Sequence, residues 1–168
     1  MLMNIPDSSF SASSERSLNY AASRSRLRET HDGSLGACWS ADVGVAQPWI
    51  QADLLHSFQV GKVATQRRTS VQVDEWVTRY TLSHGLSESE LRVVLDEHLN
   101  ERIFEGNDEG FAAVEHLFTP VLARFVRLTV QEFHGERASL RWDLYACFAG
   151  EVPLPEKHSI IPFKLLKK

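Results

Sequence analysis

Residues 124–148, RFVRLTVQEFHGERASLRWDLYACF, alternate apolar with polar side chains on both sides of a turn-prone centre, FHGERAS. Successive side chains of a β-strand point to opposite faces of the sheet, so every second residue shares a face. One face of each half is apolar, and it consists of Val126, Leu128 and Val130 and of Leu140, Trp142 and Leu144. The stretch therefore predicts two strands that turn these faces toward a common core.

Similar short segments lie upstream of this stretch. They are rich in Val, Ile, Phe, Trp and Thr, and most alternate: 49–54 (WIQADL), 58–66 (FQVGKVATQ), 76–84 (WVTRYTLSH) and 93–99 (VVLDEHL). Several short strands separated by turn-prone residues such as EGNDEG are typical of an antiparallel sandwich or barrel. Residues 1–46 are rich in Ser, Gly, Ala and Arg without a sustained period, so we expect loops around short strands there.

The stretch from Ser87 to Leu99 also fits a helix. Its Ser and Glu residues suit a helix N-terminus, and an apolar stripe at helical spacing is formed by Leu91, Val94, Leu95 and Leu99. The β-branched pair Val93 and Val94 and the flanking strands fit a hairpin as well. We favour the hairpin.

Length and charge limit the class of protein. A chain of 168 residues is ordinary for one compact domain with a tail. Its formal charge of -4 argues against nucleic-acid binding, which depends on Lys and Arg contacts to phosphates. No apolar run approaches the roughly 20 residues that span a bilayer. The N-terminal residues have no signal-peptide pattern, which fits an excised fragment or a cytoplasmic protein.

Catalytic and metal-binding motifs are not found in the sequence. It has no G-x-S-x-G, no phosphate-binding Gly loop and no HExxH, and its seven histidines lack ligand-like spacing. Glu105 and Asp108, beside Gly106 and Asn107, suit a calcium site, but a polar turn is the stronger interpretation. We expect a protein that is not an enzyme and needs no cofactor, with calcium as the one exception to test.

The ordered motifs of the chain resemble the discoidin domain, the C-type domain of coagulation factors five and eight. They are IPDSSFSASS, SRSRL, GACWSA, PWIQADL, VATQRR, EWVTRYTLSH, IFEGND, LARFVRLTV and LRWDLYAC. The resemblance implies an all-β, distorted jelly-roll sandwich or barrel of about eight antiparallel strands, with ligand-binding spike loops at one end. We expect a discoidin-type domain over residues 1–149. Residues 150–168, with Pro153, Pro155 and Pro162, are expected to form a tail or linker with a basic, apolar end.

Two departures from the family pattern concern the cysteines. The family resemblance implies that Cys147 pairs with a cysteine at the start of the domain, which this sequence lacks. Cys147 therefore has its partner outside this chain, which we favour, or is unoxidised, or pairs with Cys38. We expect Cys38 to be a buried free thiol that behaves as a small apolar residue.

Two further departures concern the ligand-binding loops and the packing. The family's Thr-Gln-Gly turn has Arg67 in place of glycine, which affects the identity of the ligand. The Trp that the family usually has on a later strand is Leu91 here, and this change affects only packing.

The resemblance places the first spike from Glu15 to Tyr20 and the second from Arg67 to Asp74. Leu18 and Tyr20 suit a membrane interface or a sugar face, unless Tyr20 packs under its own loop. In the second spike the cations are Arg67 and Arg68, and the apolar tips are Val71 and Val73. Cations beside exposed apolar tips suit an acidic glycan, an acidic patch on a protein or an anionic bilayer, unless they are ordinary solvated charges. The candidate binding residues are Arg16, Leu18, Asn19, Tyr20, Arg67, Arg68, Thr69, Ser70, Val71, Val73 and, on a short third loop, His84.

Other charged and aromatic residues are assigned to structure. Charges in the middle of strands must be paired if they are buried, and those expected to be so are Asp53, Arg124, Arg127, Arg141 and Asp143. The four tryptophans at strand-like positions are expected to fill the core: Trp39, Trp49, Trp76 and Trp142.

The leading hypothesis is a secreted or cell-surface adhesion module whose spike loops bind a glycan or a matrix protein. The family resemblance implies this extracellular location and excludes catalysis. The first alternative is phospholipid binding, through anionic lipid at the same loops. The second alternative is a structural or oligomerising domain, in which the basic tail from Lys164 to Lys168 or a missing cysteine joins subunits.

Overall fold

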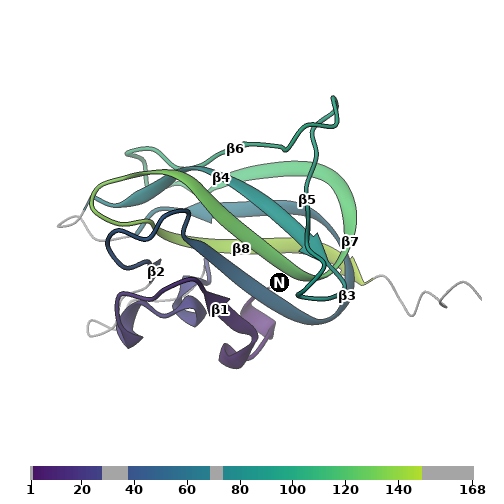
Figure 1. The fold of residues 1–168 in the computed structure, drawn as a ribbon, viewed down its shortest axis with the longest axis horizontal. Coiled ribbons are helices and arrows are strands. Elements are labelled where there is room, and N and C mark those ends of the chain that lie inside the picture. The colour runs from purple at the N-terminus through teal and green to yellow at the C-terminus, as the bar shows by residue number, and fades with distance from the viewer. Residues whose placement is uncertain (1, 28–37, 69–73, 149–168) are drawn as a thin grey trace, which may run out of the picture.

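A computed structural model describes residues 2–27, 38–68 and 74–148, which form an antiparallel β-sandwich (Figure 1). The strands are β1 (Phe10–Ala12), β2 (Trp39–Ser40), β3 (Trp49–Gln66), β4 (Trp76–Gly85), β5 (Arg92–Val93), β6 (Phe104–Glu105), β7 (Val114–His134) and β8 (Ser139–Phe148). Four short 3-10 helices precede β2 in the described residues: η1 (Leu2–Asn4), η2 (Asp7–Ser9), η3 (Leu18–Tyr20) and η4 (Ala22–Ser25). None of these described helices is long enough to cross a bilayer.

Strands β3 and β7 each belong to both layers of the sandwich. Residues 49–53 of β3 pair with 125–129 of β7, and residues 58–65 pair with 114–123, with an irregularity between Asp53 and Phe58. One layer contains the first half of β3 and the second half of β7, with β1, β4, β5 and β6. The other layer contains the remaining halves with β8 and β2. Both long strands bend at one end of the molecule, visible on the right of Figure 1.

The predicted core faces are confirmed by the structure. Val126, Leu128 and Val130 are buried between the layers, and so are Leu140, Trp142 and Leu144. Trp39 and Trp76 are also buried, whereas Trp49 is only partly buried. The period-two pattern therefore identified the inward faces of β7 and β8, and the all-β prediction is correct.

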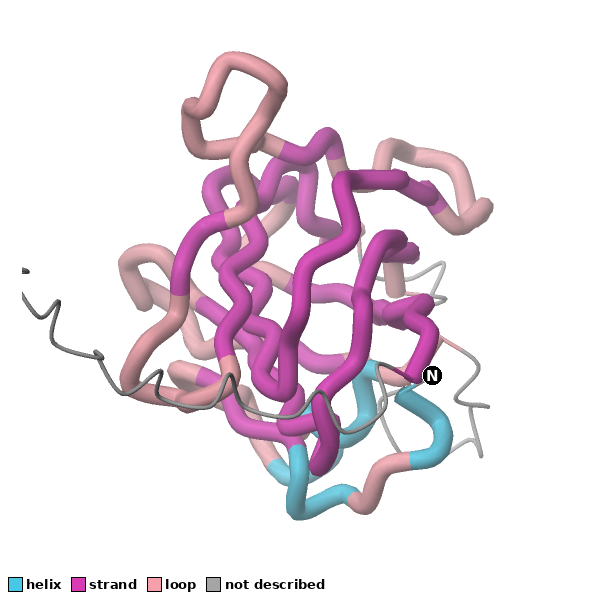
Figure 2. The backbone as a smooth tube through the Cα atoms, turned by 90° about the vertical axis from the view of Figure 1, so that its right-hand side faces the viewer, coloured by secondary structure: helices cyan, strands magenta, loops and turns pink. Residues whose placement is uncertain are grey.

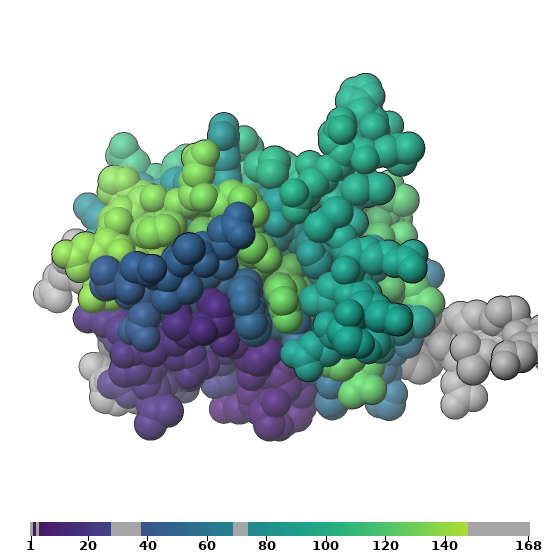
Figure 3. Space-filling view, viewed as in Figure 1, coloured from purple at the N-terminus to yellow at the C-terminus, as the bar shows by residue number. Residues whose placement is uncertain are grey.

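The helical alternative for residues 87–99 is wrong. Residues 92–93 form β5, and Leu95 pairs with Glu101 in an antiparallel bridge, so the segment is an irregular hairpin. The Asp96 carboxylate accepts hydrogen bonds from the amides of His98 (2.8 Å) and Asn100 (2.9 Å), a local arrangement that competes with helix formation. This segment between β5 and β6 projects from the body of the domain (Figures 1 and 3).

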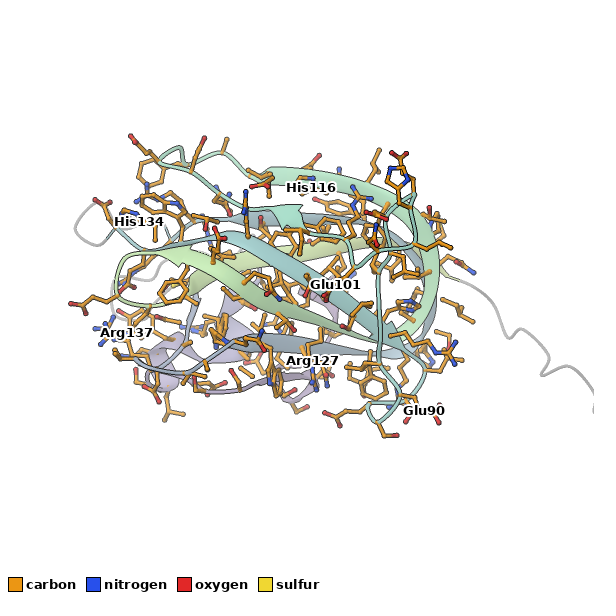
Figure 4. All side chains as sticks on the ribbon, turned by 45° about the horizontal axis from the view of Figure 1, so that its top comes forward. Glu90, Glu101, His116, Arg127, His134 and Arg137 are labelled. Carbon is orange, nitrogen blue, oxygen red and sulfur yellow. The ribbon has the colours of Figure 1, made fainter. Side chains whose placement is uncertain are left out.

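The two ends of the sandwich differ in their connections, and Figure 2 views the molecule from the bend end. One end, called the spike end, contains the end of β3, the start of β4 and the turn from β7 to β8. These come together because Trp76 pairs with His134 and Thr65 pairs with Trp142. At the other end, called the bend end, β3 and β7 change direction and the chain passes from β4 to β5. Strand β8 ends there, opposite Phe58. Figure 4 shows His134 and Arg137 at the spike end and Glu90 at the bend end.

Candidate functional site

Arg67 lies at the centre of the spike end. It directly follows β3, and only 4% of its side chain is exposed. Its Nη1 donates to the carbonyl oxygen of Glu109 at 2.7 Å, and its Nη2 donates to Oδ1 of Asp74 at 3.0 Å. The guanidinium carbon lies 4.3 Å from the centroid of the Trp76 ring and 4.6 Å from that of Phe111. Arg67 is therefore fixed in place, with its charge compensated by Asp74.

A cavity of about 610 Å³ opens beside this arginine, and it is lined by Arg67, Asp74, Trp76, Glu109, Phe111 and His134. Trp76 and His134 stack with their ring centroids 4.1 Å apart, while Phe111 is 46% exposed. The cavity thus combines aromatic rings with hydrogen-bonding groups and lies in the size range of small-molecule sites. It can accept a ligand that has both an apolar face and hydroxyl groups.

The loop between β6 and β7 forms one wall of this cavity because it is held to the sandwich at its base. The amide of Gly106 donates to Thr78 O at 2.6 Å, and that of Asn107 donates to Val77 O at 2.8 Å. A Cβ atom on Gly106 would lie 2.3 Å from the Val77 carbonyl oxygen, so only glycine allows this approach. Further along the loop, Gln66 Nε2 donates to Phe111 O. The loop is therefore placed by β3 and β4.

The two spikes meet at Arg68, which points away from the cavity. Its Nη2 donates to the Tyr20 hydroxyl at 2.8 Å, and its guanidinium lies 4.9 Å from the Tyr20 ring centroid. Arg16 lies 4.7 Å from the same centroid. Tyr20 is half-buried by these contacts, whereas Leu18 is 86% exposed at the start of η3. Leu18 is therefore the apolar tip of the first spike.

Buried Glu75 supports Arg68 from beneath. Its Oε2 accepts a hydrogen bond from Ser139 Oγ at 2.9 Å and lies 3.8 Å from Arg68 Nη1. Its Oε1 lies 3.6 Å from Arg137 Nη1, and Ser139 in turn contacts Ser40 at 2.8 Å. A buried carboxylate needs such partners, and these connect β4, β8 and the second spike. Arg68 thus has structural partners on both sides.

The remaining predicted binding residues lie in different places. Arg16 and Asn19 are exposed on the first spike. Thr69, Ser70, Val71 and Val73 lie outside the described residues. His84 is not in a loop: it is half-buried in β4, where it pairs with Arg92 and Val126 at the bend end. His84 lies eight positions along β4 from Trp76, about 27 Å at the usual rise, so it does not join this site.

Two of the charges assigned to structure form a clear pair. Arg124 donates through Nε and Nη2 to the two oxygens of Asp53, both at 2.8 Å. This hydrogen bonding lowers the pKa of Asp53. The prediction of structural pairing is confirmed for these two residues.

The other three structural charges have different surroundings. Arg127 donates to Gln51 Oε1 at 2.9 Å and lies 4.0 Å from the Trp49 ring centroid. Asp143 Oδ1 accepts a hydrogen bond from the Leu2 amide at 2.8 Å. Burial lowers the pKa of the Arg141 guanidinium. Two of these three residues therefore have hydrogen-bonded partners within the fold.

Both cysteines are free thiols in the structure, so the alternative of a bond between Cys38 and Cys147 is wrong. Cys38 is buried, as predicted, and burial raises its pKa to about 12. Cys147 is exposed near the end of β8. The two cysteines differ in exposure because of their positions. Cys38 directly precedes β2, which contributes buried Trp39 to the core, whereas Cys147 lies at the bend end.

The acids considered for calcium have other contacts. Glu105 lies 3.3 Å from Arg79, and the Asp108 carboxylate accepts a hydrogen bond from the Gly110 amide at 2.8 Å. In the described part of the chain, no three His, Cys, Asp or Glu residues form a group that could hold a metal ion.

Sequence reasoning missed most of the cavity walls. Trp76 is predicted only as a core residue and Asp74 only as the end of the second spike, while Glu109, Phe111 and His134 are not among the predicted binding residues. A signal was present in the turn NDEGF, where an aromatic residue directly follows a polar loop. His134 lies beside the cavity because β4 pairs with β7. The sequence does not show this pairing.

Known proteins similar to the chain agree with this architecture. The F5/8 type C domain model matches residues 9–144. Mouse retinoschisin is 28% identical over 131 residues, which are 77% of this chain and 56% of that protein, so the chain spans about half of this relative. Discoidin II of Dictyostelium discoideum is 24% identical with a TM-score of 0.71, over 82% of this chain and 53% of that one.

A carbohydrate-binding module from Clostridium perfringens, solved in complex with GalNAc-β-1,3-galactose, is 21% identical with a TM-score of 0.63. The match covers 84% of this chain and 98% of that module. The family model covers most of the chain, and the solved structures share its jelly-roll-like β-sandwich. The chain belongs to the F5/8 type C, or discoidin, domain family.

Proposed function

We propose that this domain is a non-catalytic, extracellular module that binds a neutral glycan in the Arg67 cavity. Domains of this family bind carbohydrates, proteins or phospholipids. The observation that carries the proposal is the combination of the exposed Phe111 ring with the stacked Trp76 and His134 rings beside hydrogen-bonding groups. Sugar rings have apolar faces that pack on aromatic rings, while their hydroxyls bond to groups such as the Asp74 carboxylate.

The charge balance favours a neutral sugar over an acidic one. Arg67 already donates to Asp74 and to the Glu109 carbonyl, so an incoming anion would have to displace Asp74 and meet its carboxylate. A sugar hydroxyl can instead donate to Asp74 and leave the Arg67 bonds in place. The related Clostridium module in complex with GalNAc-β-1,3-galactose supports the choice of this disaccharide as the first probe.

The test is a calorimetric titration of the chain with GalNAc-β-1,3-galactose and with galactose. Phe111→Ala removes the exposed stacking face, so we expect binding about tenfold weaker. Phe133→Ala is the matched control, because Phe133 is 40% exposed on β7 and does not line the cavity. Equal affinity of the two variants would contradict the proposed site. A glycan array without hits, with and without calcium, would contradict the ligand class.

A second candidate function is binding to an anionic phospholipid membrane. Leu18 favours it, since an 86% exposed leucine beside Arg16 suits insertion at an anionic interface. Sedimentation with phosphatidylserine liposomes should then require acidic lipid, weaken with salt, and be lost in Leu18→Ser. Leu99→Ser is the control, since Leu99 is 78% exposed on the projecting segment between β5 and β6. Undiminished sedimentation of Leu18→Ser would rule out this mechanism.

A further inference from the structure

A second cavity lies at the bend end, on the opposite end of the sandwich from the Arg67 cavity. Its volume is about 610 Å³, and it is lined by Asn4, Ile5, Leu54, Leu55, His56, Phe58, Leu144, Tyr145 and Ala146. Most of its walls are apolar, and none of the lining residues is Asp, Glu, Lys or Arg. Such a cavity suits a few apolar side chains better than a charged ligand.

The bend of β3 builds one wall of this cavity in a strained but fixed conformation. Leu55 has a φ of 67°, in the left-handed region, and is 44% exposed. A leucine in the left-handed region is strained, and it persists only where its neighbours impose that conformation. The Leu55 amide donates to Asp53 Oδ1 at 2.8 Å, and Arg124 donates two hydrogen bonds to the same carboxylate. The leucine is therefore presented on a preformed wall.

We propose that the C-terminal segment of this same chain, residues 149–168, docks in the bend-end cavity through its apolar run 160–166, IIPFKLL. The place where the described chain ends supports this occupant. Phe148, the last residue of β8, pairs with Phe58, and β8 contributes Leu144, Tyr145 and Ala146 to the cavity. The described chain therefore ends next to the cavity walls.

The length and the sequence of the segment fit this occupant. The 12 residues from 148 to 160 can extend up to about 40 Å, which is longer than β8 itself. Gly and Pro are residue types that favour turns, and the stretch before the apolar run contains Gly150, Pro153 and Pro155, a composition that suits a reversal toward the cavity. Covalent attachment gives an effective concentration of about a millimolar, so even a weak apolar contact is populated.

Charge complementarity favours the same arrangement. Residues 149–168 contain four Lys and two Glu, a formal charge of +2 out of the total of -4, so residues 1–148 carry -6. A basic, apolar segment is attracted to an acidic body whose cavity is itself uncharged. The apolar side chains can enter the cavity while the terminal lysines remain in water.

Hydrogen–deuterium exchange of the full chain tests this docking. We expect the amides of residues 160–166, except Pro162, which has no N–H, to exchange about tenfold more slowly than in an unprotected peptide, and Leu55→Gly to abolish this protection. Glycine accepts the left-handed conformation, so the variant removes the wall without imposing backbone strain. Leu99→Gly is a matched control, because Leu99 is also an exposed leucine with a φ of 63° but lies far from the cavity. In Leu99→Gly, the amides of residues 160–166 should be as well protected from exchange as in the unmodified chain.

A converse pair of variants tests the segment itself. Ile161→Asp should accelerate exchange of the Leu55 and His56 amides by about tenfold, whereas Ser159→Asp, which adds the same charge without removing an apolar side chain, should not. Unprotected amides at 160–166 in the unmodified chain, or equal protection in Leu55→Gly and Leu99→Gly, would overturn the proposal. Protection that disappears on dilution would mean that the segment of a second copy occupies the cavity, which also overturns docking within one chain.

Discussion

Arg68 and Arg67 are neighbours in the sequence with different surroundings at the spike end. Arg67 lines the cavity and binds Asp74, whereas Arg68 connects Tyr20 of the first spike to buried Glu75. Consecutive side chains at the end of a strand point in opposite directions, which accounts for the difference. Arg68 therefore holds the first spike in position through Tyr20.

Removal of Arg68 should destabilise the fold as well as the spike. Arg68→Gln breaks the bond to the Tyr20 hydroxyl and takes one cation from Glu75, so we expect a loss of about 1–3 kcal/mol in the free energy of unfolding. Urea denaturation measures this loss. Arg16→Gln serves as the control: Arg16 is exposed and contacts the same ring, and its substitution should change stability by less than about 0.5 kcal/mol. Similar effects of both substitutions would contradict the role assigned to Arg68.

Among the elements, the loop between β6 and β7 decides whether the Arg67 cavity exists. It carries Phe111 and Glu109, and its base is held by the close contact of Gly106 with Val77. Gly106→Ala would place a Cβ atom 2.3 Å from a backbone oxygen, so the loop must move. We expect a loss of about 1–3 kcal/mol in stability together with weaker glycan binding.

Thermal unfolding and the disaccharide titration measure these two effects. Gly110→Ala is the control in the same loop. A Cβ atom on Gly110 would lie 3.0 Å from Oδ1 of Asp108, a side chain that is free to move aside. We expect its binding to stay close to that of the unmodified chain. If Gly106→Ala binds the disaccharide with unchanged affinity, this loop does not shape the site.

The predictability of each element depends on how local its causes are. The strands β7 and β8 follow from alternation, because Val126, Leu128 and Trp142 face a core whatever their partners are. The Arg67 cavity could not be predicted in the same way, because it requires that Trp76 lie beside His134, a pairing 58 residues apart. The helical alternative for 87–99 failed for a local reason, the Asp96 turn, which apolar spacing does not report.

At the scale of the whole molecule, two groups at the bend end should determine the response to acid. Burial lowers the pKa of His84 and outweighs the opposing effect of its bond to the Leu122 carbonyl, while the nearby charge of Arg92 lowers it further. The unfolded chain then binds the proton more readily than the folded one, so stability should fall as the pH drops below about 6.5. His84→Gln should reduce this loss between pH 6.5 and pH 5. Urea denaturation across this range measures it, with His98→Gln as an exposed control.

Asp53 should add a second loss of stability at lower pH. Its pKa is lowered in the folded protein, chiefly by Arg124, so the stabilisation is complete above the unfolded value of about 3.9. It disappears as the pH falls through the folded pKa. The loss should be smaller in Asp53→Asn, and an unchanged acid limb in this variant would contradict the role of the ion pair.

The shared strands also have a consequence for folding. Because β3 and β7 each contribute to both layers, neither layer can form its full set of pairs before the other is present. The pairing of Trp39 with Leu140 closes a loop of about 100 residues, so the fold has a high contact order. We therefore expect folding on the millisecond-to-second timescale, in one cooperative step without a stable single-layer intermediate.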